Sequence, residues 1–252
     1  MWHFQKIDPV TFLSNFRFIT YVGSGGKTAF IELCARELSR RGKSVAITTT
    51  TRIFAREPYV LVEDGAEWTK NLGFMRIGKT MSHGKLTGLE FDEIERLGKI
   101  YDFVLIEADG AKGKPMKFPA PHEPVMPPLS EMICVLCGLD GLLGRVDEKV
   151  FRWEFFSRAT GIDGVAPVTP QVFLRFFSGD TLLKSVDIEK CTVVLNKYDM
   201  LRDRGLALEL AKEIIQKTGV QNVIVASSFF NVFYLVNRGQ KTEDGHRPAN
   251  FY

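Results

Sequence analysis

The segment 21–28, with the sequence YVGSGGKT, carries residues that could hold a phosphate group. Its glycines allow a close approach of the backbone and angles that side chains disfavour. Lys27 could reach the terminal phosphates of a nucleotide, and the Thr28 hydroxyl could ligate Mg²⁺. The segment is shorter than the GxxxxGK[ST] pattern, because Tyr21 stands where the first glycine would be. The expected nucleotide-binding residues here are Gly23, Ser24, Gly25, Gly26, Lys27, Thr28 and Ala29.

This loop lies between a predicted strand, residues 16–22, and an amphipathic helix that ends at Gly42. A strand, a glycine-rich turn and a helix would aim backbone N–H groups and a helix N-terminus at phosphate oxygens. With its first glycine at Gly23, the shortened GxxGK[ST] form resembles the loops of Mur ligases and of the P-loop class that includes MinD, UreG and HypB. The alternative is a glycine-rich connection that binds nothing.

An acidic partner for the metal is expected at the end of a neighbouring buried strand. The segment 103–111, FVLIEADGA, offers Glu107 and Asp109, and residues 107–110 have the spacing of the DxxG element of GTPases. If the strand continues through both residues, we expect the two carboxylates to face opposite ways, so that only one contacts Mg²⁺ while the other orients water or caps a helix. A solvated acidic strand end is the alternative. The expected catalytic residues are Lys27, Glu107 and Asp109.

Four threonines and an arginine, residues 48–52, follow the next predicted strand. They would lie beside the phosphate loop if the two strands were neighbours. The hydroxyls could bind metal, phosphate or an attacking water, and Arg52 could offset phosphate charge. Threonine is also a common strand residue, so pairing in the sheet is an equal alternative. The expected metal ligands are Thr28, Thr50, Glu107 and Asp109.

The segment 193–200, VVLNKYDM, places an Asn-Lys-x-Asp element directly after an apolar strand. GTPases select guanine with this element. A carboxylate can accept hydrogen bonds from the guanine ring N–H and 2-amino group, and a site built around it rejects a base that lacks those donors. The element favours GTP, with ATP as the alternative. The expected base-binding residues are Asn196, Lys197, Asp199 and, at the end of the next strand, Ser227.

The segment 112–130, KGKPMKFPAPHEPVMPPLS, is too rich in proline for a helix or a central strand. We therefore expect a long functional loop at 110–130, directly after the strand that carries the carboxylates. Its side chains could reach over the γ-phosphate, with His122 and Glu123 as acid and base or as ligands of an ion. An exposed loop of ordinary polar residues is the alternative. The expected substrate-binding residues are Arg52, Lys112, Lys117, His122 and Glu123.

Short apolar runs alternate with amphipathic stretches along the chain, which is the pattern of strand, crossover helix and strand. This pattern predicts an α/β fold, a three-layer P-loop NTPase-like domain with a mainly parallel sheet and helices on both faces. Eight strands are expected, at 16–22, 44–49, 59–63, 74–78, 102–108, 132–138, 191–196 and 222–227. Beyond the helix after the phosphate loop, helices are expected at 91–99, 148–160, 170–177 and 202–218.

Composition narrows the class of protein. The 252 residues, 45% of them hydrophobic, are enough for one domain at 1–236, with 237–252 as a poorly ordered tail. A formal charge of only +3 favours neither nucleic acid nor an anionic membrane as a partner. Because no apolar run approaches the roughly 18 residues of a membrane span, and no signal peptide is evident, we expect a cytoplasmic protein. The four cysteines lie in apolar runs, which favours reduced core residues over a zinc site or disulfides.

The segments VGSGGKT, TTTTRI, EADGAK, HEPVMP and VLNKYD together resemble the YqeC family of selenium-dependent hydroxylase accessory proteins, over most of the chain. The resemblance implies a role in the maturation of a selenium-dependent molybdenum hydroxylase, with that enzyme or a cofactor-maturation protein as partner. We expect Mg²⁺-dependent binding and hydrolysis of a nucleoside triphosphate. One alternative is an ATP-dependent small-molecule kinase, transferase or ligase with a Mur-like short loop. Another is a nucleotide-gated binding module with little catalysis. The P-loop class often dimerises around nucleotide, which leaves a homodimer open.

Overall fold

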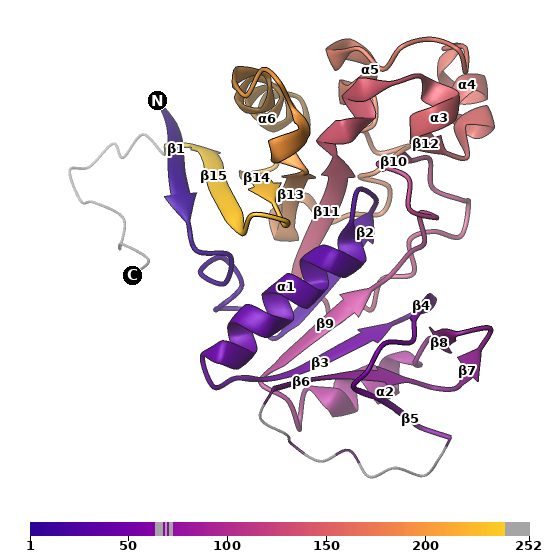
Figure 1. The fold of residues 1–252 in the computed structure, drawn as a ribbon, viewed down its shortest axis with the longest axis vertical. Helices are drawn as coiled ribbons and strands as arrows, with labels where there is room; N and C mark the ends of the chain where they lie inside the picture. The colour runs from indigo at the N-terminus through magenta and orange to yellow at the C-terminus, as the bar shows by residue number, and fades with distance from the viewer. Residues whose placement is uncertain (64–67, 69, 71–72, 240–252) are drawn as a thin grey trace.

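A wide sheet organises the chain in the computed structural model, which describes all residues except 64–67, 69, 71–72 and 240–252 (Figure 1). In the described part, its ten strands are β1 Trp2–Ile7, β2 Phe18–Gly23, β3 Ser44–Thr49, β5 Tyr59–Leu61, β6 Gly73–Gly78, β9 Phe103–Glu107, β11 Met132–Gly138, β13 Cys191–Asn196, β14 Asn222–Ser227 and β15 Val232–Arg238. Their order is β1-β15-β14-β13-β11-β2-β9-β3-β6-β5. All pairs from β14 to β5 are parallel, whereas β15 pairs antiparallel with β14 and β1. The predicted α/β class and mainly parallel sheet are confirmed.

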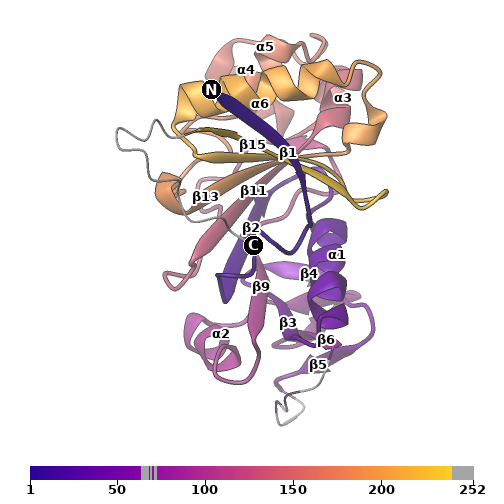
Figure 2. The same ribbon diagram turned by 90° about the vertical axis from the view of Figure 1, so that its left-hand side faces the viewer.

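Helices cover both faces of this sheet. The longest are α1 Lys27–Arg40 and α6 Gly205–Thr218, and α2 Phe91–Leu97 is shorter. Successive residues of a strand point to opposite faces. Accordingly, Val193 of β13 packs in the cluster that contains α6 side chains, and Val194 packs in the cluster that contains α1 side chains. Figure 2 shows α1 and α2 on opposite sides of β9 and β3. The expected helices on both faces are therefore present.

The central strands were predictable because they are buried on both faces. Every residue of β3, β9, β11 and β13 is buried. Apolar residues therefore follow one another in these strands instead of alternating with polar ones. The edge strand β1 and its neighbour β15 were not predicted, since β1 is largely exposed and mixes polar with apolar residues. Asn237 and Arg238, assigned to the tail from sequence, end β15, and the rest of that segment from residue 240 lies outside the described residues.

The expected helix at 148–160 is wrong. The chain forms α3 Val146–Lys149, then β12 Val150–Phe151, then α4 Trp153–Thr160. Strand β12 pairs with β10 Met116–Lys117 of the proline-rich loop, and Arg152 takes a left-handed φ of 63° that interrupts any helix. This pairing anchors the loop, which otherwise lacks regular structure as expected.

The remaining elements are short. Strands β4 Arg52–Phe54, β7 Met81–Ser82 and β8 Lys85–Thr87 form a three-stranded sheet. Helix α5 is Pro170–Leu174, shorter than the predicted 170–177, and 3₁₀ turns cover Leu139–Leu143, Ile188–Lys190 and Tyr198–Met200. All four cysteines are buried and free, as expected. No helix in the described ranges has the length and apolar character needed to cross a bilayer.

Candidate functional site

The glycine-rich loop joins β2 to α1 at the carboxyl edge of the sheet. Gly23, Gly25 and Gly26 all have positive φ, at 94°, 77° and 103°. A Cβ atom on Gly23 would lie 2.2 Å from the Leu136 carbonyl oxygen, and one on Gly25 would lie 2.1 Å from the Gly138 nitrogen. The loop is pressed against the end of β11, so both positions require glycine for steric as well as conformational reasons.

The first amides of the loop are already engaged within the protein. The Gly23 N–H donates to Asp109 Oδ2 at 2.8 Å, the Ser24 N–H to the Leu136 carbonyl at 2.9 Å, and the Gly25 N–H to the Lys114 carbonyl at 3.1 Å. Gly26 occupies the N-cap of α1 and has no side chain to cap the helix. The first amides of a helix have no partner within it, so the opening turn of α1 is the part of the loop suited to an anion.

Lys27 is buried between a backbone oxygen and two carboxylates. Its Nζ lies 2.7 Å from the Gly23 carbonyl, 3.1 Å from Asp109 Oδ1 and 3.8 Å from Glu107 Oε1. Both carboxylates therefore meet the same ammonium group, although β9 ends at Glu107, and the expectation that they face opposite ways is wrong. Because β9 pairs directly with β2, the expected neighbouring acidic strand is present.

Only one of these carboxylates contacts the hydroxyl that was expected to bind metal. The Thr28 hydroxyl donates to Glu107 Oε2 at 3.1 Å, whereas Asp109 binds the Gly23 amide and two lysines. A hydroxyl and a carboxylate side by side are hard oxygen ligands, which Mg²⁺ prefers, and one or two such groups satisfy it when phosphates supply the rest. Thr28 and Glu107 thus fit Mg²⁺.

Burial and neighbouring charges have opposite effects on the pKa values of Lys27 and Glu107. Burial alone would lower the pKa of Lys27, but the carboxylates of Asp109 and Glu107 raise it above its ordinary value, so the lysine stays charged. Burial raises the pKa of Glu107, and the Lys27 charge only partly offsets that effect. A bound cation would remove this penalty by stabilising the Glu107 carboxylate.

Behind Lys27 lies a second buried lysine. The Nζ of Lys117 is 2.8 Å from Asp109 Oδ2, 2.9 Å from the Gly110 carbonyl and 2.7 Å from Glu123 Oε2. Arg152 completes the network through two hydrogen bonds to Glu123, at 2.6 and 3.1 Å. Although burial opposes it, hydrogen bonding from Arg152 and Lys117 lowers the pKa of Glu123 to about 2.

A cleft of about 950 Å³ borders the first turn of α1. It is strongly cationic: among the described residues that line it, seven carry positive charge and two are carboxylates, Glu107 and Glu123. The cations are Lys27, Arg52, Arg56, Lys85, Lys112, Lys114 and Arg152. The predicted substrate-binding residues Arg52, Lys112, His122 and Glu123 lie here, whereas Lys117 is fully buried behind the wall.

The threonine run is displaced from the phosphate loop. Strand β9 lies between β2 and β3, so the two strands are not neighbours. The Thr50 hydroxyl donates to the Val125 carbonyl at 2.6 Å, and Thr51 lines the cleft instead. Arg56, Lys85 and Arg152 were not among the predicted site residues, because long-range packing of β4, β8 and β12 brings them to the cleft and no local pattern marks them.

The Asn-Lys-x-Asp element lies on the other side of the phosphate loop. Asn196 Nδ2 donates to the Gly25 carbonyl at 2.9 Å, and its Oδ1 accepts from the Ser228 hydroxyl at 2.9 Å. The Ser227 hydroxyl donates to Asp199 Oδ1 at 2.5 Å. Lys197 pairs with Asp140 at 2.7 Å. The structure therefore brings Asn196 against the phosphate loop, with Asp199 and Ser227 in contact beside it.

Comparison with known proteins connects the cleft to one family. A model of the YqeC protein family matches residues 19–154, from β2 to the start of α4. "Uncharacterized protein YqeC" of Escherichia coli (strain K12) is 34% identical over 157 residues, and the match covers 57% of this chain and 60% of that relative's length. The family model thus includes the phosphate loop, both carboxylates, the proline-rich loop and Arg152, and it ends before the Asn-Lys-x-Asp element.

Proposed function

The chain belongs to the YqeC family, and we propose that it binds a nucleoside triphosphate with Mg²⁺ at the first turn of α1 and hydrolyses it. One observation carries the proposal. Seven cations line the cleft beside the uncapped N-terminus of α1, where the Thr28 hydroxyl donates to the Glu107 carboxylate. A triphosphate is the ligand whose charge, length and metal requirement match that arrangement.

Different residues of the cleft would have different roles in the reaction. Mg²⁺, held by Thr28 and Glu107, would supply charge neutralisation for the phosphate oxygens. Lys27 would exchange its bond to the Gly23 carbonyl for a phosphate oxygen, while Asp109 keeps the ammonium group in place from behind. Arg52 lines the cleft and could stabilise the charge that develops on the transferred phosphoryl group.

Guanine is the base that we propose for the nucleotide. The proposal is supported by the contact of Asn196 with Gly25, which places the Asn-Lys-x-Asp element beside the phosphate loop. Asp199 accepts one hydrogen bond from Ser227 and retains acceptor capacity for the donors of guanine. ATP remains the alternative ligand.

A role in maturing a selenium-dependent molybdenum hydroxylase is proposed from family resemblance alone. The partner would be that enzyme or a cofactor-maturation protein in the cytoplasm. Nucleotide hydrolysis would then time the interaction between the two proteins.

Calorimetric titration with GTP, ATP and their diphosphates in Mg²⁺ tests the proposal, together with an assay of phosphate release. We expect Lys27→Ala to weaken triphosphate binding by about 2–3 kcal/mol, roughly 30- to 150-fold, because a charge-assisted contact is lost. Lys99→Ala, at a lysine whose side chain is 72% exposed on another surface, is the matched control. Equal affinity of Lys27→Ala and wild type would refute the site. Binding without phosphate release would support the gated binding module, and release only with an added small molecule would support the transferase.

A further inference from the structure

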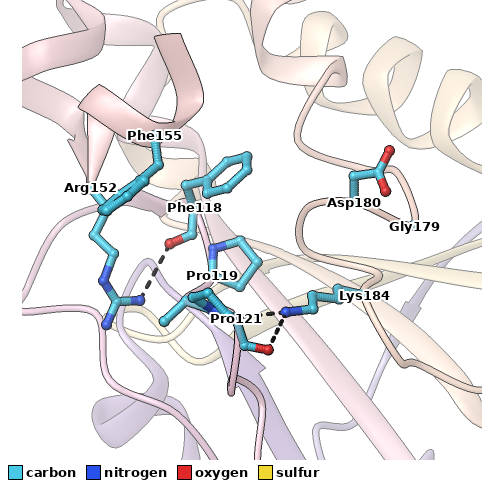
Figure 3. Close-up of a pocket in the computed structure, with 9 residues that line it drawn as sticks. Phe118, Pro119, Pro121, Arg152, Phe155, Gly179, Asp180 and Lys184 are labelled. Carbon is cyan, nitrogen blue, oxygen red and sulfur yellow. Dashed lines mark hydrogen bonds between the residues drawn. The ribbon is translucent and has the colours of Figure 1, made fainter. Parts of the chain in front are cut away.

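A second cavity of about 500 Å³ lies on the far side of Arg152 from the phosphate cleft. It is bounded by residues 118–121 of the proline-rich loop, by Arg152 and Phe155, and by Gly179, Asp180 and Lys184. Figure 3 shows Arg152 and Phe155 on one side, Asp180 and Lys184 on the other, and the proline-rich loop between them.

The walls of this cavity combine flat apolar surfaces with one available cation. Phe118, Pro119 and Phe155 supply the apolar part, and Phe155 is 51% exposed although it is aromatic. Lys184 donates to the Ala120 and Pro121 carbonyls at 3.0 and 2.6 Å and has no ion pair with a carboxylate in the described part of the chain. Binding sites for small molecules have this composition, with apolar walls and few polar groups.

Arg152 separates the two cavities and lines both of them. Its charge is matched by Glu123, so Lys184 is the better anchor for an anionic ligand in the second cavity. Arg152 also holds a left-handed φ of 63°, a conformation that costs energy in a non-glycine residue. The bidentate contact with Glu123 and the stacking of its guanidinium 4.5 Å from the Phe151 ring centre keep it there.

We propose that this second cavity binds a small molecule with a flat, largely apolar ring and one anionic group. The ring would lie against Phe155 and Phe118, and the anion would bind the Lys184 ammonium group. Asp180 also lines the cavity and could accept a hydrogen bond from a ring N–H. As a binding site the cavity is independent of the nucleotide. Its role as a second-substrate site, separated from the proposed phosphate site by Arg152, rests on the proposed function.

Anilinonaphthalene sulfonate, a flat apolar ring system with one anionic group, is a suitable fluorescent probe. We expect saturable one-to-one binding to the full chain. Phe155→Ala and Lys184→Ala should each weaken that binding at least about tenfold, whereas Phe230→Ala, at a phenylalanine that is 63% exposed elsewhere, should not change it. The uncharged analogue phenylnaphthylamine should bind more weakly and should not respond to Lys184→Ala.

Two further measurements separate this site from the nucleotide site. Lys27→Ala should weaken nucleotide binding and leave probe binding unchanged, and Phe155→Ala should weaken probe binding and leave nucleotide binding unchanged. Thermal melting of each variant, followed by circular dichroism, checks that the fold is retained. Probe binding that both Phe155→Ala and Lys184→Ala leave unchanged, or binding that does not saturate, would overturn the proposal.

Discussion

The polar residues on the two sides of the phosphate loop are held in place by different kinds of contact. On the cleft side, the buried lysines Lys27 and Lys117 both pair with Asp109, and Lys117 also pairs with Glu123. On the other side, Asn196 and Asp199 accept hydrogen bonds from serines, with Asp199 partly exposed. The cleft side thus depends on buried charge pairs that are costly to break, whereas on the Asn-Lys-x-Asp side Asp199 accepts a hydrogen bond from Ser227 and is partly exposed, so that a ligand can reach it.

The largest effect should come from the buried lysine behind the cleft. Lys117→Met keeps the volume of the side chain but leaves Asp109 and Glu123 without its charge. We expect the free energy of unfolding to fall by about 3–5 kcal/mol, as when one partner of a buried pair is removed. Chemical denaturation measures this change. Lys217→Met, at a lysine whose side chain is 56% exposed, should change stability by less than about 0.5 kcal/mol. Similar losses in both variants would contradict the network.

The pH dependence of stability should distinguish the two glutamates of the cleft. The pKa of Glu123 is lowered from 4.5 to about 2, so its ionised form stabilises the folded protein at neutral pH. Because the native state binds fewer protons there, this contribution is complete above about pH 4.5 and is lost as the pH falls towards 2. Burial raises the pKa of Glu107, so its ionisation has the opposite sign and costs stability as the pH rises. Urea titrations between pH 2 and 7 should therefore show that the free energy of unfolding falls less steeply towards acidic pH in Glu123→Gln than in the wild type. Glu107→Gln should not show this change.

Asp199→Ala tests the side of the loop that we propose to recognise the base. Loss of the carboxylate should weaken GTP binding by about 1.5–3 kcal/mol, since the guanine donors lose a charged acceptor, and should leave ATP binding unchanged. Asp203→Ala, at an exposed aspartate that binds only the Gly205 amide among its described contacts, is the control. A GTP preference that survives Asp199→Ala in calorimetry would remove the guanine assignment while leaving the phosphate site intact.

The smallest effect is expected for the lysine of the Asn-Lys-x-Asp element. Lys197 pairs with Asp140, but its side chain is 32% exposed. Lys197→Ala should cost about 1–2 kcal/mol of unfolding free energy, because the lysine itself reaches solvent but its loss leaves the buried Asp140 carboxylate without this cation. A loss as large as that of Lys117→Met in the same denaturation assay would show that the two sides do not differ in the way described.

The parts of the fold that sequence alone could predict are those decided locally. Strands β3, β9, β11 and β13 are buried along their whole length and were therefore predictable as apolar runs, and the carboxyl ends of β2 and β9 bring Lys27, Thr28 and Glu107 together. Other features depend on contacts between segments that are distant in the sequence, and local patterns could not predict them. The break at Arg152 depends on β12 meeting β10 more than thirty residues earlier in the chain. The burial of Lys117 depends on the path of the proline-rich loop, so its local sequence suggested an exposed ligand-binding lysine.

A crystal structure grown with Mg²⁺ and a non-hydrolysable GTP analogue tests the central claim most directly. We expect the phosphates at the first turn of α1, with Lys27 moved from the Gly23 carbonyl to a phosphate oxygen and Mg²⁺ between Thr28 and Glu107. A triphosphate bound elsewhere, with Lys27 still on the Gly23 carbonyl and the turn empty, would contradict the account.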